Sequence, residues 1–190
     1  MKRDLIKPLK SSFLSCEKDT QRILEKLFID NRQHGNTLKK LLVISAKDCI
    51  DNPKYDEKVR EMSLKDLFDE QYIKLNPKIK MFEHEEIKSY LIFSFYNFTP
   101  NATNTEFRDC MVTFDIICHT DYWDIGNYRQ RPLKIAGYID GLLDGCKLTG
   151  IGTFQFLSCN EIVLSDDLAG YTLTYIAVHG SDDTISDSEE

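Results

Sequence analysis

Between residues 110 and 119, every second side chain falls on one face of the chain. That face is entirely apolar and consists of Cys110, Val112, Phe114, Ile116 and Cys118. This period of two is typical of a β-strand with one buried face. A loop rich in aromatic and charged residues follows. From Pro132 to Leu143 the apolar positions then recur at helical spacing. We expect this strand and this helix to pack on each other.

The N-terminal part of the chain has helical periodicity. Residues 17–31 place apolar side chains on one stripe and charged ones outside it, which predicts an amphipathic helix ending near Gly35. A second helix is expected behind Asn36 or Thr37, either of which is a suitable N-cap, and we expect it to continue toward Asp51. The sequence from Ser63 to Asp66 resembles a capping box and predicts a short third helix.

Strand patterns dominate the rest of the chain. Residues 80–98 alternate with period two and are rich in aromatic and β-branched side chains, and a polar, turn-prone stretch joins them to the strand at 110–119. Residues 154–164 and 171–178 form a second pair of strands around turn residues. The expected class is α+β: a mainly antiparallel sheet of two β-hairpins, with one helix packed on it and N-terminal helices before it.

This order of elements divides the chain into three parts. We expect an N-terminal helical region over residues 1–79 that packs on the core, an α+β core over 80–180, and a disordered acidic tail over 181–190. Both faces of the sheet carry apolar residues, and a single helix covers only one face. The other face therefore requires either the N-terminal helices or a neighbouring subunit.

The net charge of the chain bears on its expected partners and does not alter the expected fold. At 190 residues with a formal charge of −7, the chain lacks the basic surface on which nucleic-acid binding depends. It contains neither a signal-peptide pattern nor a long apolar segment, so we expect a soluble protein made in a cytoplasm, with no membrane contact. We expect its six cysteines to be free thiols, which suits that compartment.

A chemical site would most simply begin at His119, because Asp115, Asp121 and Asp124 are close to it in sequence. No second histidine lies at a metal-binding spacing, so we assign no catalytic residue, cofactor or metal. A small cytoplasmic enzyme or metal-binding protein that uses His119 with these aspartates remains the alternative.

The loop over residues 121–131 combines the only tryptophan with residue types that are enriched at protein interfaces. In a second interpretation, Trp123 closes the end of the core while the arginines pair with Asp121 and Asp124, and both interpretations can hold. A monomeric adaptor that binds a partner through this loop is a further alternative. The predicted subunit or partner interface comprises Tyr122, Trp123, Asp124, Tyr128, Arg129 and Arg131, together with Asn101, Asn104 and Phe107 of the first hairpin.

The sequence VTFDIICHTDYWDIGNYRQRPLKIAGYIDGLL, followed by GYTLTYIAVHG, resembles the tail-terminator and head-to-tail joining proteins of the neck and tail of tailed bacteriophages. The resemblance covers residues 80–180 by the order of elements and, more loosely, the RILEKLF and LKKLLVI segments. Its most specific parts are the FDIICH strand, the tryptophan-containing loop and the Arg-Pro that opens the helix. The N-terminal helical region and the acidic tail depart from the pattern.

The resemblance implies a structural, non-enzymatic virion protein. Such proteins form homo-oligomeric rings, commonly hexameric, that terminate the tail tube and join the tail to the head connector. The implied partners are further copies of the chain and other neck, connector and tail-tube proteins, with DNA only as cargo passing through the lumen. The implied location is the virion, after synthesis in the host cytoplasm.

Overall fold

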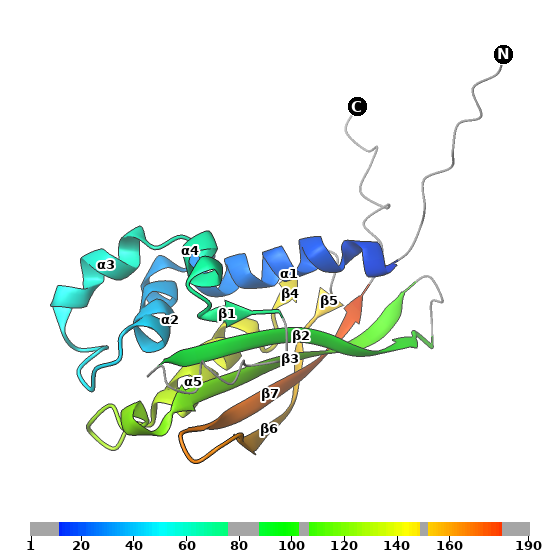
Figure 1. The fold of residues 1–190 in the computed structure, drawn as a ribbon. Helices are drawn as coiled ribbons and strands as arrows, with labels where there is room; N and C mark the ends of the chain where they lie inside the picture. Colours follow the sequence, from blue (N-terminus) through cyan, green and yellow to red (C-terminus); the bar gives the residue numbers. More distant parts are fainter. Residues whose placement is uncertain (1–11, 76–87, 103–106, 149–151, 180–190) are drawn as a thin grey trace, which may run out of the picture.

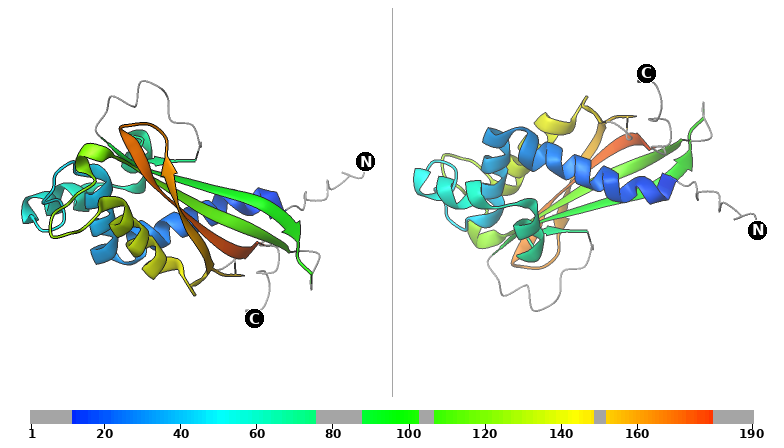
Figure 2. Two further views of the ribbon diagram at one scale, coloured as in Figure 1. Left: turned by 90° about the horizontal axis from the view of Figure 1, so that it is seen from below. Right: turned by 90° about the horizontal axis from the view of Figure 1, so that it is seen from above.

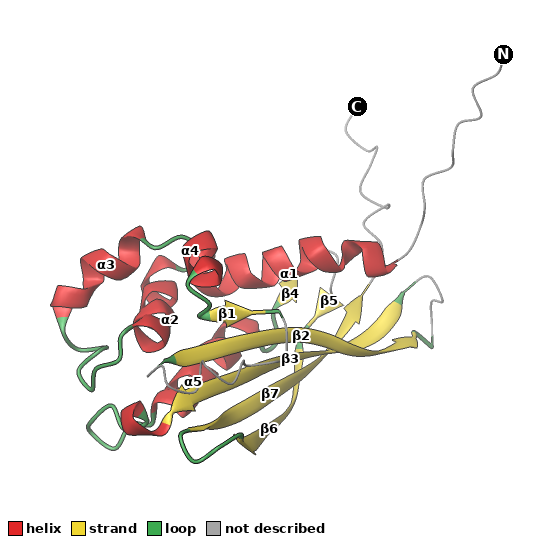
Figure 3. Cartoon of the chain, viewed as in Figure 1, coloured by secondary structure: helices red, strands yellow, loops and turns green. Residues whose placement is uncertain are grey.

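A computed structural model describes residues 12–75, 88–102, 107–148 and 152–179, and it confirms the α+β class. Helices lie on one face of a five-stranded sheet with strand order β1-β2-β3-β7-β6 (Figures 1 and 3). All neighbouring strands are antiparallel except β1, which runs parallel to β2. The elements are η1 (Ser12–Ser15), α1 (Cys16–Glu25), the π-helical η2 (Lys26–Asp30), α2 (Arg32–Val43), η3 (Pro53–Tyr55), α3 (Asp56–Glu61), α4 (Leu64–Asp69), β1 (Ile73–Lys74), β2 (Ser89–Pro100), β3 (Arg108–His119), η5 (Thr120–Tyr122), α5 (Arg131–Leu143), β4 (Lys147–Leu148), β5 (Gly152–Thr153), β6 (Gln155–Val163) and β7 (Leu168–His179).

The central strands have the register that the period of two predicts. Phe93 of β2 lies opposite Phe114 of β3, which in turn lies opposite Leu173 of β7, and all three side chains are buried. Rows of this kind on neighbouring strands build the apolar face of the sheet. The predicted strand from residue 80 begins at Ser89 in the structure, and residues 76–87 lie outside the described part of the chain.

The two N-terminal helices meet closely, and the predicted boundary between them was wrong. The second helix begins at Arg32 behind Asn31, whose side chain accepts a hydrogen bond from the His34 amide, and not behind Asn36 or Thr37. Gly35 therefore lies inside α2. A Cβ atom built at Gly35 would be only 2.4 Å from the Phe28 carbonyl oxygen, so glycine is required for this approach rather than for ending a helix.

The segment between α2 and β2 contains more short helices and strands than the sequence predicted. α2 ends at Val43 instead of continuing toward Asp51, and the short η3, α3 and β1 had no counterpart in the prediction. The capping box was predicted correctly: the Ser63 hydroxyl accepts from the Asp66 amide, and the Asp66 carboxylate accepts from the Ser63 amide at 2.7 Å.

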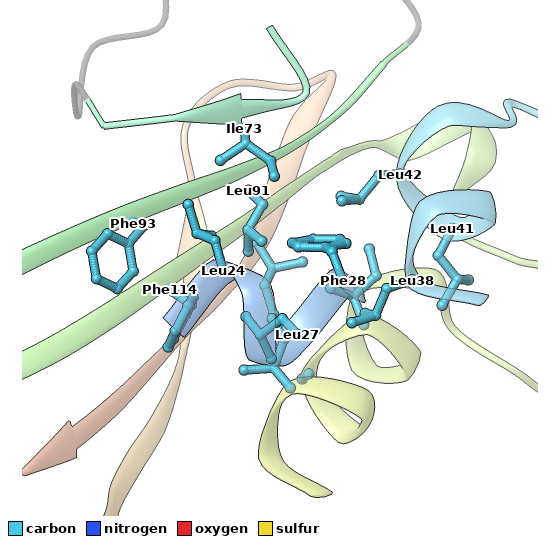
Figure 4. Packing of buried hydrophobic residues seen from close by; sticks show 14 of the residues in the cluster. Leu24, Leu27, Phe28, Leu38, Leu41, Leu42, Ile73, Leu91, Phe93 and Phe114 are labelled. Carbon is cyan, nitrogen blue, oxygen red and sulfur yellow. The ribbon is translucent and has the colours of Figure 1, made fainter. Parts of the chain in front are cut away.

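A single hydrophobic cluster joins the helices to the sheet. Leu24, Leu27 and Phe28 of the N-terminal helices meet Leu91 and Phe114 of the sheet within it (Figure 4). Figure 2 places α1 across the same face of the sheet that α5 covers. The N-terminal helices therefore do not cover the opposite face. That face carries a small buried cluster of Tyr90, Ile92, Ile117 and Leu168.

In the part of the chain that the structure describes, no helix is both long and apolar enough to cross a membrane. All six cysteines are thiols rather than disulfides, which confirms the expectation from the sequence.

We expect the stability of the protein to fall at alkaline pH. Burial raises the pKa of the Cys110 thiol to about 12 and that of Cys118 to about 11, and burial together with a hydrogen bond to Asp140 raises the pKa of Tyr175. The unfolded chain releases these protons at lower pH than the folded one. The stabilisation is therefore complete below the ordinary cysteine pKa of 9.0 and is lost as the pH rises toward about 11 to 12.

Urea unfolding under reducing conditions at pH 7 and at increasingly alkaline pH measures this effect. The Cys110→Ala and Cys118→Ala variants should have a shallower alkaline dependence than the wild type. A free energy of unfolding that stays constant through this pH range would contradict the assignment.

Candidate interaction site

The loop between β3 and α5 is built on short-range backbone contacts. The Trp123 amide donates to the Thr120 carbonyl at 3.1 Å, and the Arg131 amide donates to the Trp123 carbonyl at 2.7 Å. Asp124 and Gln130 pair as an isolated antiparallel bridge between these contacts. The ends of the loop are therefore fixed, and the residues from Ile125 to Arg129 form its tip.

Arg131 holds the loop to the end of α2. It is 1% exposed, and its Nη1 donates to the carbonyl oxygens of Leu41 at 2.6 Å and Ile44 at 2.9 Å. Its Nη2 donates to the Ala46 carbonyl at 2.9 Å, and its Nε to the Tyr122 carbonyl at 2.8 Å. The last carbonyls of a helix have no partner within the helix, and this guanidinium supplies one. Arg131, predicted as an interface residue, is buried as a structural anchor, so we leave it out of the interface.

Arg129 makes a second connection, at the surface. Its Nη1 donates to Asp51 Oδ1 at 3.2 Å, its Nη2 donates to Asp51 Oδ2, and its Nε donates to the Gly126 carbonyl at 3.2 Å. These hydrogen bonds hold the pKa of Asp51 below its ordinary value. The interpretation in which the arginines pair with Asp121 and Asp124 was wrong for Arg129, whose carboxylate partner comes from the α2–α3 connection.

Tyr128 lies at the tip of the loop with its side chain fully exposed, at 106% of the reference area. Gly126, Asn127 and Tyr128 have φ angles of 75°, 53° and 61°, so three consecutive residues occupy the left-handed region. A bulky side chain is rarely found there, because its Cβ crowds the backbone. Backbone strain that presents an aromatic ring to solvent is typical of a binding loop.

Trp123 lines the same concavity as Tyr128. Its indole is half-buried at the edge of the main hydrophobic cluster, 6.2 Å from the Tyr171 ring, and its Nε1 donates to Gln130 Oε1 at 3.3 Å. Trp123 therefore packs at the edge of the core, as the second interpretation expected, and its contact with a partner stays a prediction. The open concavity in front of it has a volume of about 690 Å³ and is lined by Trp123, Asp124, Asn127, Tyr128, Arg129 and Gln130.

Two substitutions at Tyr128 test whether the loop is strained. The Tyr128→Gly variant should be more stable than Tyr128→Ala by about 1 kcal/mol, because glycine adopts this φ without the Cβ penalty and neither variant loses buried area. Chemical unfolding of both variants gives the difference. Equal stabilities would mean that the backbone at Tyr128 is relaxed.

The first hairpin does not extend this surface. The Asn101 amide donates to the Phe107 carbonyl at 3.1 Å, and Asn101 Nδ2 donates to Asp109 Oδ1 at 2.8 Å, while Asn104 lies outside the described residues. The hairpin and the tryptophan loop stand at opposite ends of the twelve-residue strand β3, about 36–40 Å apart. The predicted interface residues therefore form two separate surfaces.

The structure brings His119 and Asp121 together, whereas Asp115 and Asp124 have other partners. The His119 ring is buried, and its Nδ1 accepts from the Asp121 amide at 3.2 Å and lies 3.7 Å from Asp121 Oδ2. Asp115 accepts from the Thr172 hydroxyl, and Asp124 accepts from the Gly126 amide. Within the described residues, no three histidine, cysteine, aspartate or glutamate side chains gather as metal ligands. Of the three aspartates considered for that alternative, the structure therefore pairs only Asp121 with His119.

The edge strand β6 is a surface that the sequence analysis did not identify. It pairs with β7 on one side and is the last strand of the sheet on the other. Large apolar side chains on and beside it are exposed: Phe156, Leu157, Val163 and Leu164. Val163 has 69% of its area in contact with solvent. The pairing register shifts between Phe156 and Ser158, so a simple alternation does not predict which side chains are exposed.

A protein-family model described as YomW matches residues 36–177, which is more than half of the chain. The chain belongs to the YomW family. No curated protein and no solved structure matches it.

The matched span of this YomW chain contains both surfaces described above, the tryptophan loop and the strand β6. It also contains Arg131 and the end of α2 that Arg131 holds. It begins inside α2, so α1 and η2 lie outside it. The candidate interaction surfaces described above thus lie within the span that the family model matches.

Proposed function

We propose that this chain is a structural subunit of the neck or tail of a tailed bacteriophage, where copies of it form a ring that terminates the tail tube and joins the tail to the head connector. The resemblance of the FDIICH strand, the tryptophan loop and the Arg-Pro helix start to tail-terminator proteins supports this role. The observation that carries the proposal is the exposed apolar edge strand β6.

An edge strand presents unpaired backbone groups, which invite pairing with another chain. Natural proteins usually protect such edges with lysine, proline or inward-pointing charges. β6 spans nine residues and has Glu161 as its single charged residue, with no lysine and no proline. Its first residues are protected by the register shift between Phe156 and Ser158 and by the hydrogen bond from the Phe156 amide to Asp144, so the edge that remains for pairing runs from Ser158 to Val163. Because Phe156, Leu157 and Val163 are also exposed, an assembly that covers this edge removes a substantial apolar area from water.

A ring of identical subunits needs two different surfaces on each subunit, because each copy contacts its neighbours head to tail. The β6 edge and the Tyr128 loop are two such surfaces, on different elements. In the proposed assembly they bring neighbouring copies together, and the six-fold symmetry common among the resembling proteins sets the expected ring size. Other neck, connector and tail-tube proteins contact the ends of the ring, and the acidic composition suits a lumen through which DNA passes.

Native mass spectrometry of the purified chain tests self-association. We expect a closed oligomer for the wild type and a folded monomer for a variant that carries both Leu157→Lys and Val163→Lys, because two charges placed at the edge oppose its burial. Leu133→Lys is the matched control: Leu133 is a similarly exposed leucine on α5, away from β6, and its substitution should leave the oligomer intact. An oligomer that survives the double substitution would exclude β6 as the contact.

Electron microscopy with an antibody against the chain tests its location in the phage that encodes it. Labelled particles should carry the antibody where the tail meets the head. Mature particles that lack the protein would contradict the virion role.

A monomeric adaptor is the second candidate, and the fully exposed Tyr128 on its strained loop favours it. It predicts that the purified chain stays monomeric and that the combined Trp123→Ala, Tyr128→Ala and Arg129→Ala substitutions abolish binding to one partner without unfolding the chain. The mass spectrum of the wild type separates the two candidates.

A further inference from the structure

A basic pocket is lined by residues of η2, α2 and α3, and it shares no lining residue with β6 or with the concavity of the tryptophan loop. It is an open concavity of about 660 Å³. Its lining comes from three elements: Phe28 and Ile29 from η2; Arg32, Gln33, Asn36 and Lys39 from α2; and Arg60 from α3. We call this set of residues the basic pocket.

Three cations line this pocket in a chain whose formal charge is −7. Arg32 and Arg60 are exposed, and neither makes an ion pair with another residue in the described ranges. Arg32 also begins the twelve-residue helix α2, where the helix dipole favours negative charge. These side chains therefore present positive charge that the fold itself does not neutralise.

Lys39 contributes a cation from deeper in the pocket. It is 7% exposed, and its Nζ donates to the Met62 carbonyl at 2.6 Å, which uses one of the three ammonium donors. Burial lowers its pKa, while the charge of Asp66 acts in the opposite direction. Asp66 is itself held by hydrogen bonds from Ser63. A ligand carboxylate reaching this depth would relieve the desolvation of the ammonium group.

The cations are spread out rather than gathered at one point. Arg32 and Lys39 are seven residues apart, about 10 Å along α2, and Arg60 stands on a different helix. The floor is apolar, and Ile29 leaves about half of its side-chain area exposed there. This layout matches several carboxylates along an extended chain with an apolar side chain between them, whereas a single phosphate group would require convergent donors.

We propose that the basic pocket binds an acidic peptide segment that carries an apolar residue among its carboxylates. This binding is independent of the ring proposed above, because none of the pocket residues belongs to β6 or to the tryptophan loop. The chain's own residues 181–190, SDDTISDSEE, have the required composition: several carboxylates around Ile185. A peptide of this sequence is therefore a suitable probe.

Fluorescence anisotropy of the labelled peptide SDDTISDSEE with the full-length protein tests the proposal. We expect saturable binding that weakens as salt is added, because the contacts are mainly charged. Arg32→Glu and Arg60→Glu should each weaken binding by about tenfold, since each reverses a charge that faces the ligand. Ile29→Ser should weaken binding without changing its salt dependence.

Lys58→Glu is the matched control, because Lys58 is an exposed residue of α3 that does not line the pocket. It makes the same change in net charge as Arg60→Glu and should weaken binding far less. A peptide with asparagine and glutamine in place of the acidic residues should not bind.

Three results would overturn the proposal. The first is no saturable binding of the acidic peptide, and the second is an equal loss of affinity in Lys58→Glu and Arg60→Glu. The third is displacement of the labelled peptide by inorganic phosphate or a single-stranded oligonucleotide at concentrations comparable to those of unlabelled peptide. The last result would assign the pocket to phosphate groups instead. Circular dichroism of each variant separates a loss of binding from a loss of fold.

Discussion

Replacing Arg131 with methionine is expected to lower the free energy of unfolding by about 3–5 kcal/mol, although the two side chains have similar length, because several carbonyl oxygens lose a charged donor. The substitution leaves the carbonyl oxygens of Leu41 and Ile44 without the donor that the guanidinium provides, while the Ala46 carbonyl keeps only the Cys49 amide at 3.3 Å among the described residues. Buried polar groups that lose their partners carry their full desolvation cost. Because Arg131 also donates to the Tyr122 carbonyl, the tryptophan loop should lose its attachment to α2 as well.

Arg129→Met provides the control for this prediction. Arg129 lies two residues away and makes a surface ion pair with Asp51, so its loss should cost less than about 1 kcal/mol. Urea unfolding of the two variants measures both effects. Similar costs for the two substitutions would mean that Arg131 does not anchor α2.

Gly170→Ala is expected to destabilise the protein by about 3 kcal/mol or more, or to prevent folding. Gly170 lies in β7 opposite Ile117 of β3. A Cβ atom built there would lie 1.6 Å from the Ile116 carbonyl oxygen and 2.7 Å from its carbonyl carbon. Backbone atoms in a central strand pair cannot move aside as the end of a flexible side chain can, so the added methyl group must displace one strand from the other.

Gly137→Ala is the matched control, with an effect of opposite sign. Gly137 lies on the exposed side of α5, and a Cβ atom there meets nothing within 4 Å. Alanine is the better helix former, so this variant should be more stable than the wild type by about 0.5–1 kcal/mol. Thermal or chemical unfolding gives both values. A Gly170→Ala variant as stable as Gly137→Ala would show that β3 and β7 do not approach as closely as described.

The parts of the fold that were predicted correctly have strong local signals. The apolar face of β3, the helix opened by Pro132 and the Ser63 capping box each follow from residues within a few positions of one another. The boundary at Gly35 was missed because glycine serves two purposes. A glycine that ends a helix and one that allows two helices to touch have the same appearance in a sequence, and only the position of Phe28 distinguishes them.

The structure brings together only part of the predicted interface, for a related physical reason. The composition of the loop pointed to Trp123, Tyr128 and Arg129, because aromatic and arginine residues are enriched at contact surfaces, and the structure places all three around one concavity. Arg131 has the same chemistry, but its partners are carbonyls about 85–90 residues earlier in the chain. The exposed edge of β6 also depends on strand order, which no local pattern encodes.

The central claim is that copies of this chain assemble with each other through the β6 edge, and the mass of the native protein in solution tests it most directly. The account predicts that the wild type is a closed oligomer and that the Leu157→Lys, Val163→Lys variant is a folded monomer, while Leu133→Lys remains assembled. A wild-type chain that is monomeric at every concentration measured would contradict the claim.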